Sequence, residues 1–303
     1  MKTYTNILII LTLAASVLFA GCNTVNSSEP EISEEELEIA GEILGASLSE
    51  QQDGVLSSVY DAFSTVSRSG ISYAGSNTTM AKSSSDPGDR PGRGMERNFS
   101  AEYNPDTGEH IISFERSFEG PNLTKSLSVL NKYIFTDTNS EFLEFPRRDS
   151  DLIETIDFKG MRNGSFETER RNSSFTRIDT FVVSGLSDGS AILSLDGKHN
   201  GNGQMAVNLP NLERSGERTF NVQFEFQNIQ MDKAIVQENG NLEEGITGLI
   251  TYDMSMTQTR DGDTTERNLS GTIELTDDGT ALLRFERFRK TLRIAMNSGT
   301  VIE

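Results

Sequence analysis

The feature that most constrains the fold is an alternation of apolar and polar residues in the second part of the chain. Residues 219–227 place an apolar side chain at every second position: Phe220, Val222, Phe224 and Phe226. The same period recurs further on, at Ile250, Tyr252, Met254 and Met256. A period of two places alternate side chains on opposite faces of a strand, so one face is buried and the other is wet. Residues 95–303 are therefore predicted to form a large antiparallel β domain of about a dozen strands.

Short turn signals separate the predicted strands. They contain Asp, Asn, Gly or Pro and lie at residues 104–108, 187–189, 261–263 and 277–279. Such signals favour hairpins between consecutive strands. We therefore expect a mainly β fold, an antiparallel meander that forms a sandwich or a partly closed barrel.

Residues 33–67 show helical spacing instead. Ser33 and Glu36 form a capping-box pattern, and a second helix-start signal follows at Ser49. We predict two short α-helices here, with a bend at Asp53–Gly54, whose apolar faces pack on the sheet or on each other. Residues 68–94 have no apolar periodicity and many chain breakers, which predicts a flexible linker.

The N-terminus has the pattern of an exported protein. Lys2 precedes an apolar run from Ile7 to Ala20, which is shorter than the roughly 20 residues of a membrane-spanning helix. The run ends in Gly21 and Cys22, and these residues resemble the lipobox of bacterial lipoproteins. The resemblance implies that residues 1–21 are a cleaved signal peptide. It also implies that Cys22 becomes the acylated first residue of the mature chain, with residues 22–32 as a polar tether.

The same resemblance predicts a location. Asn23 follows the cysteine, where lipoproteins retained at the inner membrane carry Asp, so the outer membrane is implied. Whether the domain faces the periplasm or the outside stays open. We expect a cell-envelope protein that contacts the membrane through its acyl chains, such as palmitate.

Charge and cysteine content exclude several classes of partner. The chain has 46 acidic and 27 basic residues, a net charge of −19, which repels nucleic acid. Cys22 is the only cysteine, so its acylation leaves no thiol for a disulfide, a zinc-cysteine site or a thiolate nucleophile.

Signals for catalysis and metal binding are weak. His110 and His199 are the only histidines, and no Gly-x-Ser-x-Gly motif accompanies them. Residues 196–203 and 261–266 offer oxygen ligands for Ca²⁺, but their spacing fits turn chemistry better. We expect no catalytic residue, no metal site and no cofactor.

The apolar sheet face is the remaining candidate site. Long amphipathic strands, helices and a lipid anchor are similar in outline to the half-barrel lipoprotein carriers of the outer membrane. If the sheet encloses a cavity, the candidate lining residues are Phe220, Phe224, Phe226, Tyr252, Met254 and Met256. We favour a filled core over a cavity. We therefore expect a non-catalytic binding or structural role with an unknown ligand. The alternatives are a carrier of lipid or another apolar ligand, and an envelope hydrolase that uses His110 or His199.

Overall fold

The computed structural model describes residues 32–64, 95–169, 171–187, 190–209, 214–239, 241–260 and 262–302. Residues Glu38–Glu303 form one compact unit. The predicted signal peptide, Cys22, the tether up to residue 31 and the linker at residues 68–94 lie outside the described residues. In the described part of the chain, no helix has the length and apolar character needed to cross a membrane.

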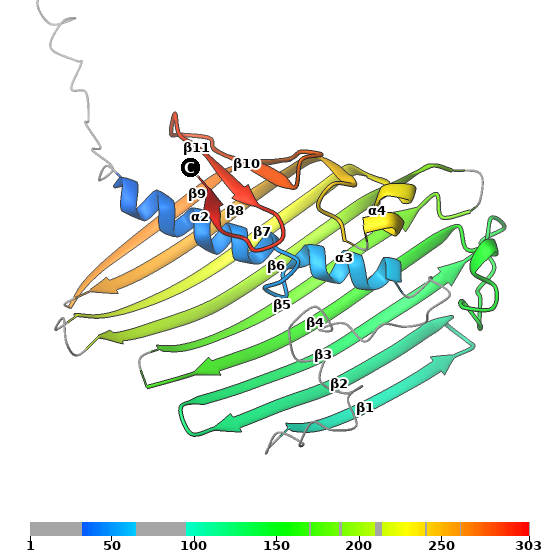
Figure 1. The fold of residues 1–303 in the computed structure, drawn as a ribbon, viewed down its shortest axis with the longest axis horizontal. Coiled ribbons are helices and arrows are strands. Elements are labelled where there is room, and N and C mark those ends of the chain that lie inside the picture. The colour runs from blue at the N-terminus through cyan, green and yellow to red at the C-terminus, as the bar shows by residue number, and fades with distance from the viewer. Residues whose placement is uncertain are drawn as a thin grey trace, which may run out of the picture. The chain divides into compact units, whose positions relative to one another are not determined.

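The described strands form a single antiparallel sheet in which each strand pairs with the next along the chain (Figure 1). Their bounds are β1 Met95–Asn104, β2 Glu109–Gly120, β3 Leu123–Thr136, β4 Thr155–Glu167, β5 Arg171–Ser184, β6 Ile192–Leu209, β7 Arg214–Asp232, β8 Ile246–Arg260, β9 Asp263–Leu275, β10 Thr280–Phe285, β11 Thr291–Ala295 and β12 Val301–Ile302. The predicted meander is confirmed. It is one open sheet, with β1 and β12 at its edges, and not the two facing sheets of a sandwich.

The two longest strands lie near the centre of the sheet. β6 has 18 residues and β7 has 19, and their pairing is interrupted only by a register shift between Leu195 and Gly197. A second shift, between Gln227 and Gln230, occurs where β7 pairs with β8. These shifts are β-bulges, which bend a strand without ending it.

Residues 196–203 correct the turn interpretation, because they lie inside β6. The three glycines of this segment, Gly197, Gly201 and Gly203, lie on one face of the strand and leave room for larger neighbouring side chains. A Cβ on Gly201 would lie 2.9 Å from Nε2 of His199, and one on Gly203 would lie 2.5 Å from Cζ of Phe220. At Gly197 a Cβ would meet Phe181. Glycine in a strand often marks such a close approach, and here it explains the turn-like composition.

The two predicted helices are present as α2 (Glu34–Leu48) and α3 (Val55–Ser64). The capping box forms as expected, because Ser33 Oγ accepts a hydrogen bond from the Glu36 amide at 3.2 Å and the Glu36 carboxylate accepts one from the Ser33 amide at 2.8 Å. The second helix begins at Val55. Ser49 Oγ instead accepts from the Gln52 amide in the turn between the helices, at 3.0 Å. Shorter helical pieces are η2 (Ser150–Leu152) and α4 (Lys233–Asn239).

Helices α2 and α3 lie across one face of the sheet, which we call the inner face (Figure 1). Gly45 of α2 approaches the backbone of Gly299, next to β12. The turn after α2 is fixed by hydrogen bonds from the amides of Glu50 and Gln51 to the carbonyls of Met296 and Asn297, at 3.2 and 3.0 Å. Fully buried side chains of the inner face form the core, among them Phe158, Phe181, Phe224, Leu193, Leu195 and Ile229.

Candidate ligand-binding site

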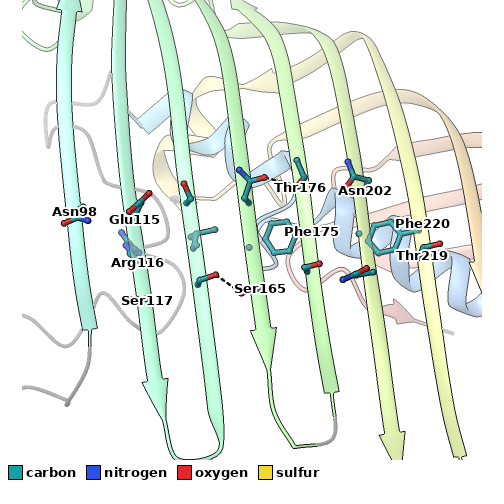
Figure 2. A pocket seen from close by; sticks show the side chains of 18 residues that line it. Asn98, Glu115, Arg116, Ser117, Ser165, Phe175, Thr176, Asn202, Thr219 and Phe220 are labelled. Carbon is teal, nitrogen blue, oxygen red and sulfur yellow. Dashed lines mark hydrogen bonds between the residues drawn. The ribbon is translucent and has the colours of Figure 1, made fainter.

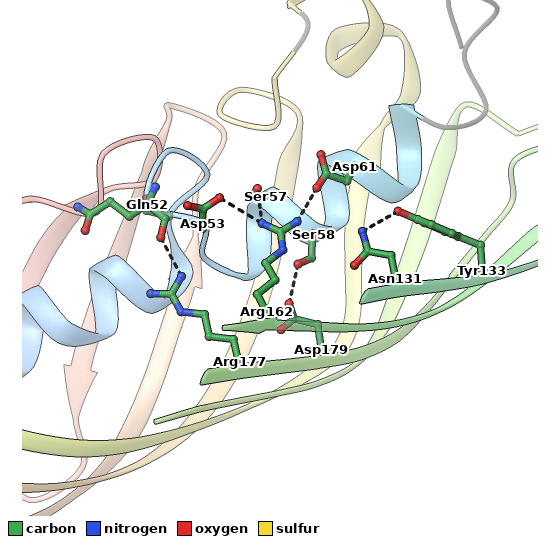
Figure 3. Close-up of polar contacts among 11 residues, drawn as sticks. Gln52, Asp53, Ser57, Ser58, Asp61, Asn131, Tyr133, Arg162, Arg177 and Asp179 are labelled. Carbon is green, nitrogen blue, oxygen red and sulfur yellow. Dashed lines mark hydrogen bonds and ion pairs between the residues drawn. The ribbon is translucent and has the colours of Figure 1, made fainter. Parts of the chain in front are cut away.

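A buried polar cluster joins α3 to the inner face (Figure 3). We define it as Ser57, Ser58, Asp61, Arg162, Asp179 and His199. The Arg162 guanidinium of β4 donates hydrogen bonds to Asp61 at 2.5 Å and to Ser57 at 3.0 Å. Ser58 donates to Asp179 of β5 at 2.6 Å. The cluster therefore fixes α3 above the centre of the sheet.

The pKa values of the two carboxyl groups of this cluster shift in opposite directions. Burial raises the pKa of Asp61 to about 7, although the charge of Arg162 and its hydrogen bond oppose the change. Burial also disfavours the ionised form of Asp179. The charge and hydrogen bond of His199, with the hydrogen bond of Ser58, outweigh that effect and hold the Asp179 pKa below its ordinary value. Asp179 is therefore a carboxylate at neutral pH.

Neither histidine has the surroundings of a catalytic base. His199 is fully buried, with its ring stacked on Phe224 and Nδ1 2.6 Å from Asp179. Ser58 binds Asp179 and not the imidazole, so the order of a Ser-His-Asp triad is not realised. His110 Nε2 lies 2.9 Å from the carbonyl oxygen of Leu143.

The sheet face opposite the helices carries a polar hollow of about 780 Å³ (Figure 2). Strand pairing arranges its hydroxyl and amide groups in rows across the strands. Members of these rows bind one another: Ser126 and Ser165 lie 2.6 Å apart, and Thr176 donates to Asn163 at 2.8 Å. Such mutual hydrogen bonding is typical of the solvated face of an antiparallel sheet.

An apolar groove of about 650 Å³ lies between α2 and the inner face of β4–β7, and we call it the α2 groove. From α2 it is lined by Ile39, Ile43 and Ala46. Its sheet side includes Phe166, Phe175, Met205 and Phe220. These four side chains are only half-buried, whereas Phe158, Phe181 and Phe224 of the same face are fully buried. The inner face is thus filled beneath α3 and hollow beside α2.

Two arginines line the same groove. Arg177 of β5 is only 6% exposed, donates one hydrogen bond to the backbone carbonyl of Gln52 at 2.8 Å, and lies over the Phe175 ring at 4.6 Å. Burial lowers the pKa of Arg177 to about 10, against the more distant charges of Asp53 and Asp179. Arg218 of β7 is half-buried, and Glu42 of α2 is the exposed acidic residue of the lining. The groove therefore combines an apolar wall with cationic groups.

Comparison with known proteins assigns neither a family nor a function to the chain. No family model, curated protein or solved structure matches the chain. The described residues also contain no group of three or more His, Cys, Asp or Glu side chains that could hold a metal ion. The interpretation of the α2 groove therefore depends on its geometry.

The structure divides the six candidate lining residues proposed from the sequence into one groove residue and five core residues. Phe220 lines the α2 groove. The other five are at most 3% exposed in the packed inner face: Phe224, Phe226, Tyr252, Met254 and Met256. Sequence reasoning missed Phe166, Phe175 and Arg177. A usable signal was the alternation of Phe175 with Arg177 in β5, which places both on one face.

Proposed function

We propose that this chain is a lipid-anchored protein of the bacterial cell envelope that binds an apolar molecule in the α2 groove without catalysing a reaction. The observation that carries the proposal is the hollow between α2 and the half-buried residues Phe166, Phe175 and Phe220. Its volume of about 650 Å³ lies within the range of pockets that bury a single small ligand.

The groove favours binding over a purely structural role. Protein interiors are close-packed, and each unfilled volume reduces stability. The sequence fills the inner face with large side chains beneath α3, yet it places the small residue Ala46 in the lining of the α2 groove. A chain under selection for stability alone would be expected to fill this space.

The proposed location rests on the N-terminal sequence. Cys22 in its lipobox-like setting supports acylation, and Asn23 supports the outer membrane. The acidic composition supports an anchor made of acyl chains alone, since a net charge of −19 is repelled by anionic headgroups. In this account the tether presents the groove close to the membrane that supplies the apolar ligand.

The hydrolase alternative is less well supported than binding. A general base must reach its substrate, and His199 is fully buried beneath α3. His110 is committed to the Leu143 carbonyl. Neither histidine lines the α2 groove.

The test uses N-phenyl-1-naphthylamine, an uncharged probe whose fluorescence rises in apolar surroundings. The chain of residues 23–303 contains the whole compact unit and is titrated with this probe. We expect saturable binding of one probe per chain. The variant Ala46→Trp fills the groove from α2 and should abolish binding. Glu38→Trp, at an exposed position of the same helix, is the matched control and should bind like the wild type. Absence of saturable binding, or equal binding by the Ala46→Trp variant, would contradict the proposed function.

A further inference from the structure

Arg177 is a buried cation whose counter-charge is missing from the described part of the chain. Its guanidinium has five N–H donors, and among the described residues its one hydrogen bond is the bond to the Gln52 carbonyl. No carboxylate among the described residues forms an ion pair with it. A buried charge is costly unless it is paired, so this position is unfavourable for folding alone.

The two carboxylates whose charges act on Arg177 already have other partners. Asp179 is engaged by His199 and Ser58, and Asp53 lies 3.5 Å from Arg162. Both groups attract Arg177 from a distance without reaching it. Within the described part of the chain no carboxylate is left to pair with Arg177, and the groove that Arg177 lines gives an external anion access to it.

Strand register places apolar surface directly beside Arg177. Phe175 is the next inner-face residue along β5, about 7 Å away at 3.4 Å per residue. Across the sheet, Phe175 pairs with Gly203, which pairs with Phe220 of β7. Ile39 and Ile43 of α2 line the same space. The groove thus has a buried cation at Arg177, an apolar length that runs from it along Phe175 and Phe220, and the half-buried Arg218 beyond Phe220.

We propose that the α2 groove binds a long-chain fatty acid, with its carboxylate on Arg177 and its hydrocarbon chain along Phe175 and Phe220. This inference rests on the proposed function and names its ligand class. A carboxylate matches the planar donor fork of a guanidinium. A single chain suits a groove of about 650 Å³ that is bounded by one helix and the sheet.

The test compares an acid with its neutral ester on the chain of residues 23–303. The probes are cis-parinaric acid, a fluorescent long-chain carboxylate, and its methyl ester. The wild type should bind the acid at least tenfold more tightly than the ester. Arg177→Met should reduce acid affinity to that of the ester and leave ester affinity unchanged, whereas Arg177→Lys should keep a preference for the acid. Arg284→Met, which removes an exposed ion pair with Glu274, is the control and should not change the preference.

A stability readout distinguishes a ligand anchor from a structural residue. Without ligand, Arg177→Met removes an uncompensated buried charge, so its melting temperature should equal or exceed that of the wild type. A lowered melting temperature together with loss of ester binding would show a structural role and overturn the inference. Equal binding of acid and ester by the wild type would overturn the fatty-acid assignment while leaving the proposed function intact. Binding of neither probe would overturn both.

Discussion

Nδ1 of His199 lies 2.6 Å from Oδ1 of Asp179, and both side chains are buried between the sheet and α3. The second oxygen of Asp179 accepts a hydrogen bond from Ser58 of α3. One carboxylate thus links strand β6, strand β5 and the helix that covers them. Arg162 and Asp61 make a second link of the same kind at the neighbouring strand.

Removal of the Asp179 carboxylate should destabilise the fold. Asp179→Ala leaves the imidazole N–H of His199 and the hydroxyl of Ser58 buried without an acceptor. The expected loss in the free energy of unfolding is on the order of 3 kcal/mol, because each unsatisfied buried group costs about 1–3 kcal/mol. Urea denaturation measures it. Asp253→Ala, at an exposed position of β8, is the control and should change stability by less than about 0.5 kcal/mol. A loss at Asp179 as small as the control's would contradict the assigned role of the cluster.

Asp61 should make stability depend on pH between about 4 and 7. Its pKa is raised from 3.8 to about 7 in the folded chain, so in this range the folded state keeps a proton that the unfolded state has released. The Asp61 contribution to stability is therefore full below the unfolded pKa and is lost as pH rises towards 7. The Asn side chain of Asp61→Asn cannot titrate. The free energy of unfolding of the wild type minus that of the variant should therefore decrease as pH rises from about 4 to 7.

The measurement is denaturation at a series of pH values. Glu38→Gln, at an exposed position of α2, controls for the loss of one negative charge. A difference between wild type and Asp61→Asn that stays constant from pH 4 to 7 would show that Asp61 titrates at its ordinary pKa.

The glycines of the inner face should tolerate no side chain where an aromatic ring covers them. In Gly203→Ala the new methyl group would lie 2.5 Å from Cζ of Phe220 and 2.9 Å from the carbonyl oxygen of Ser174. Overpacking of this kind costs roughly 1–3 kcal/mol. Gly216→Ala on β7 is the matched control, since its nearest neighbour would be the Thr259 carbonyl oxygen at 3.7 Å. Equal stability of the two variants in thermal denaturation would show that Gly203 is not needed for packing.

The anchor can be tested separately from the domain. Cys22→Ser removes the thiol that the proposed acylation requires. In a bacterial host, the wild type should incorporate labelled palmitate and partition into the detergent phase of Triton X-114, and the variant should do neither. The chain has no second cysteine. Palmitate labelling of the Cys22→Ser protein would therefore mean that the lipid is attached to a residue of another type.

The sheet could be predicted because its signal is local. Alternation in residues such as 219–227 is contained within one strand, and the turn residues lie between neighbouring strands. Residues 196–203 were misassigned because their glycines make room for the side chains of Phe181, His199 and Phe220. Phe181 and Phe220 lie on other strands, so the local sequence does not show this contact. A composition rich in Asx and Gly looks the same in a turn and in a strand under aromatic rings.

The α2 groove was less accessible to sequence reasoning, because its residues come from separate parts of the chain. Phe220 was included among the candidates since it lies in the most regular strand. Arg177 was not, since its burial depends on the Gln52 carbonyl and α2, more than a hundred residues earlier. The five buried candidates have the same alternating pattern as Phe220. Their burial in the folded chain distinguishes these core residues from the lining residue Phe220.

Ligand binding in the α2 groove is tested most directly by native mass spectrometry of residues 23–303 mixed with equal amounts of palmitate and hexadecanol. The α2 groove and Arg177 together predict one bound palmitate per chain, little bound hexadecanol, and no adduct on the Ala46→Trp variant. A wild-type chain that carries no adduct, or an adduct that persists in the Ala46→Trp variant, would show that the α2 groove does not bind a fatty acid.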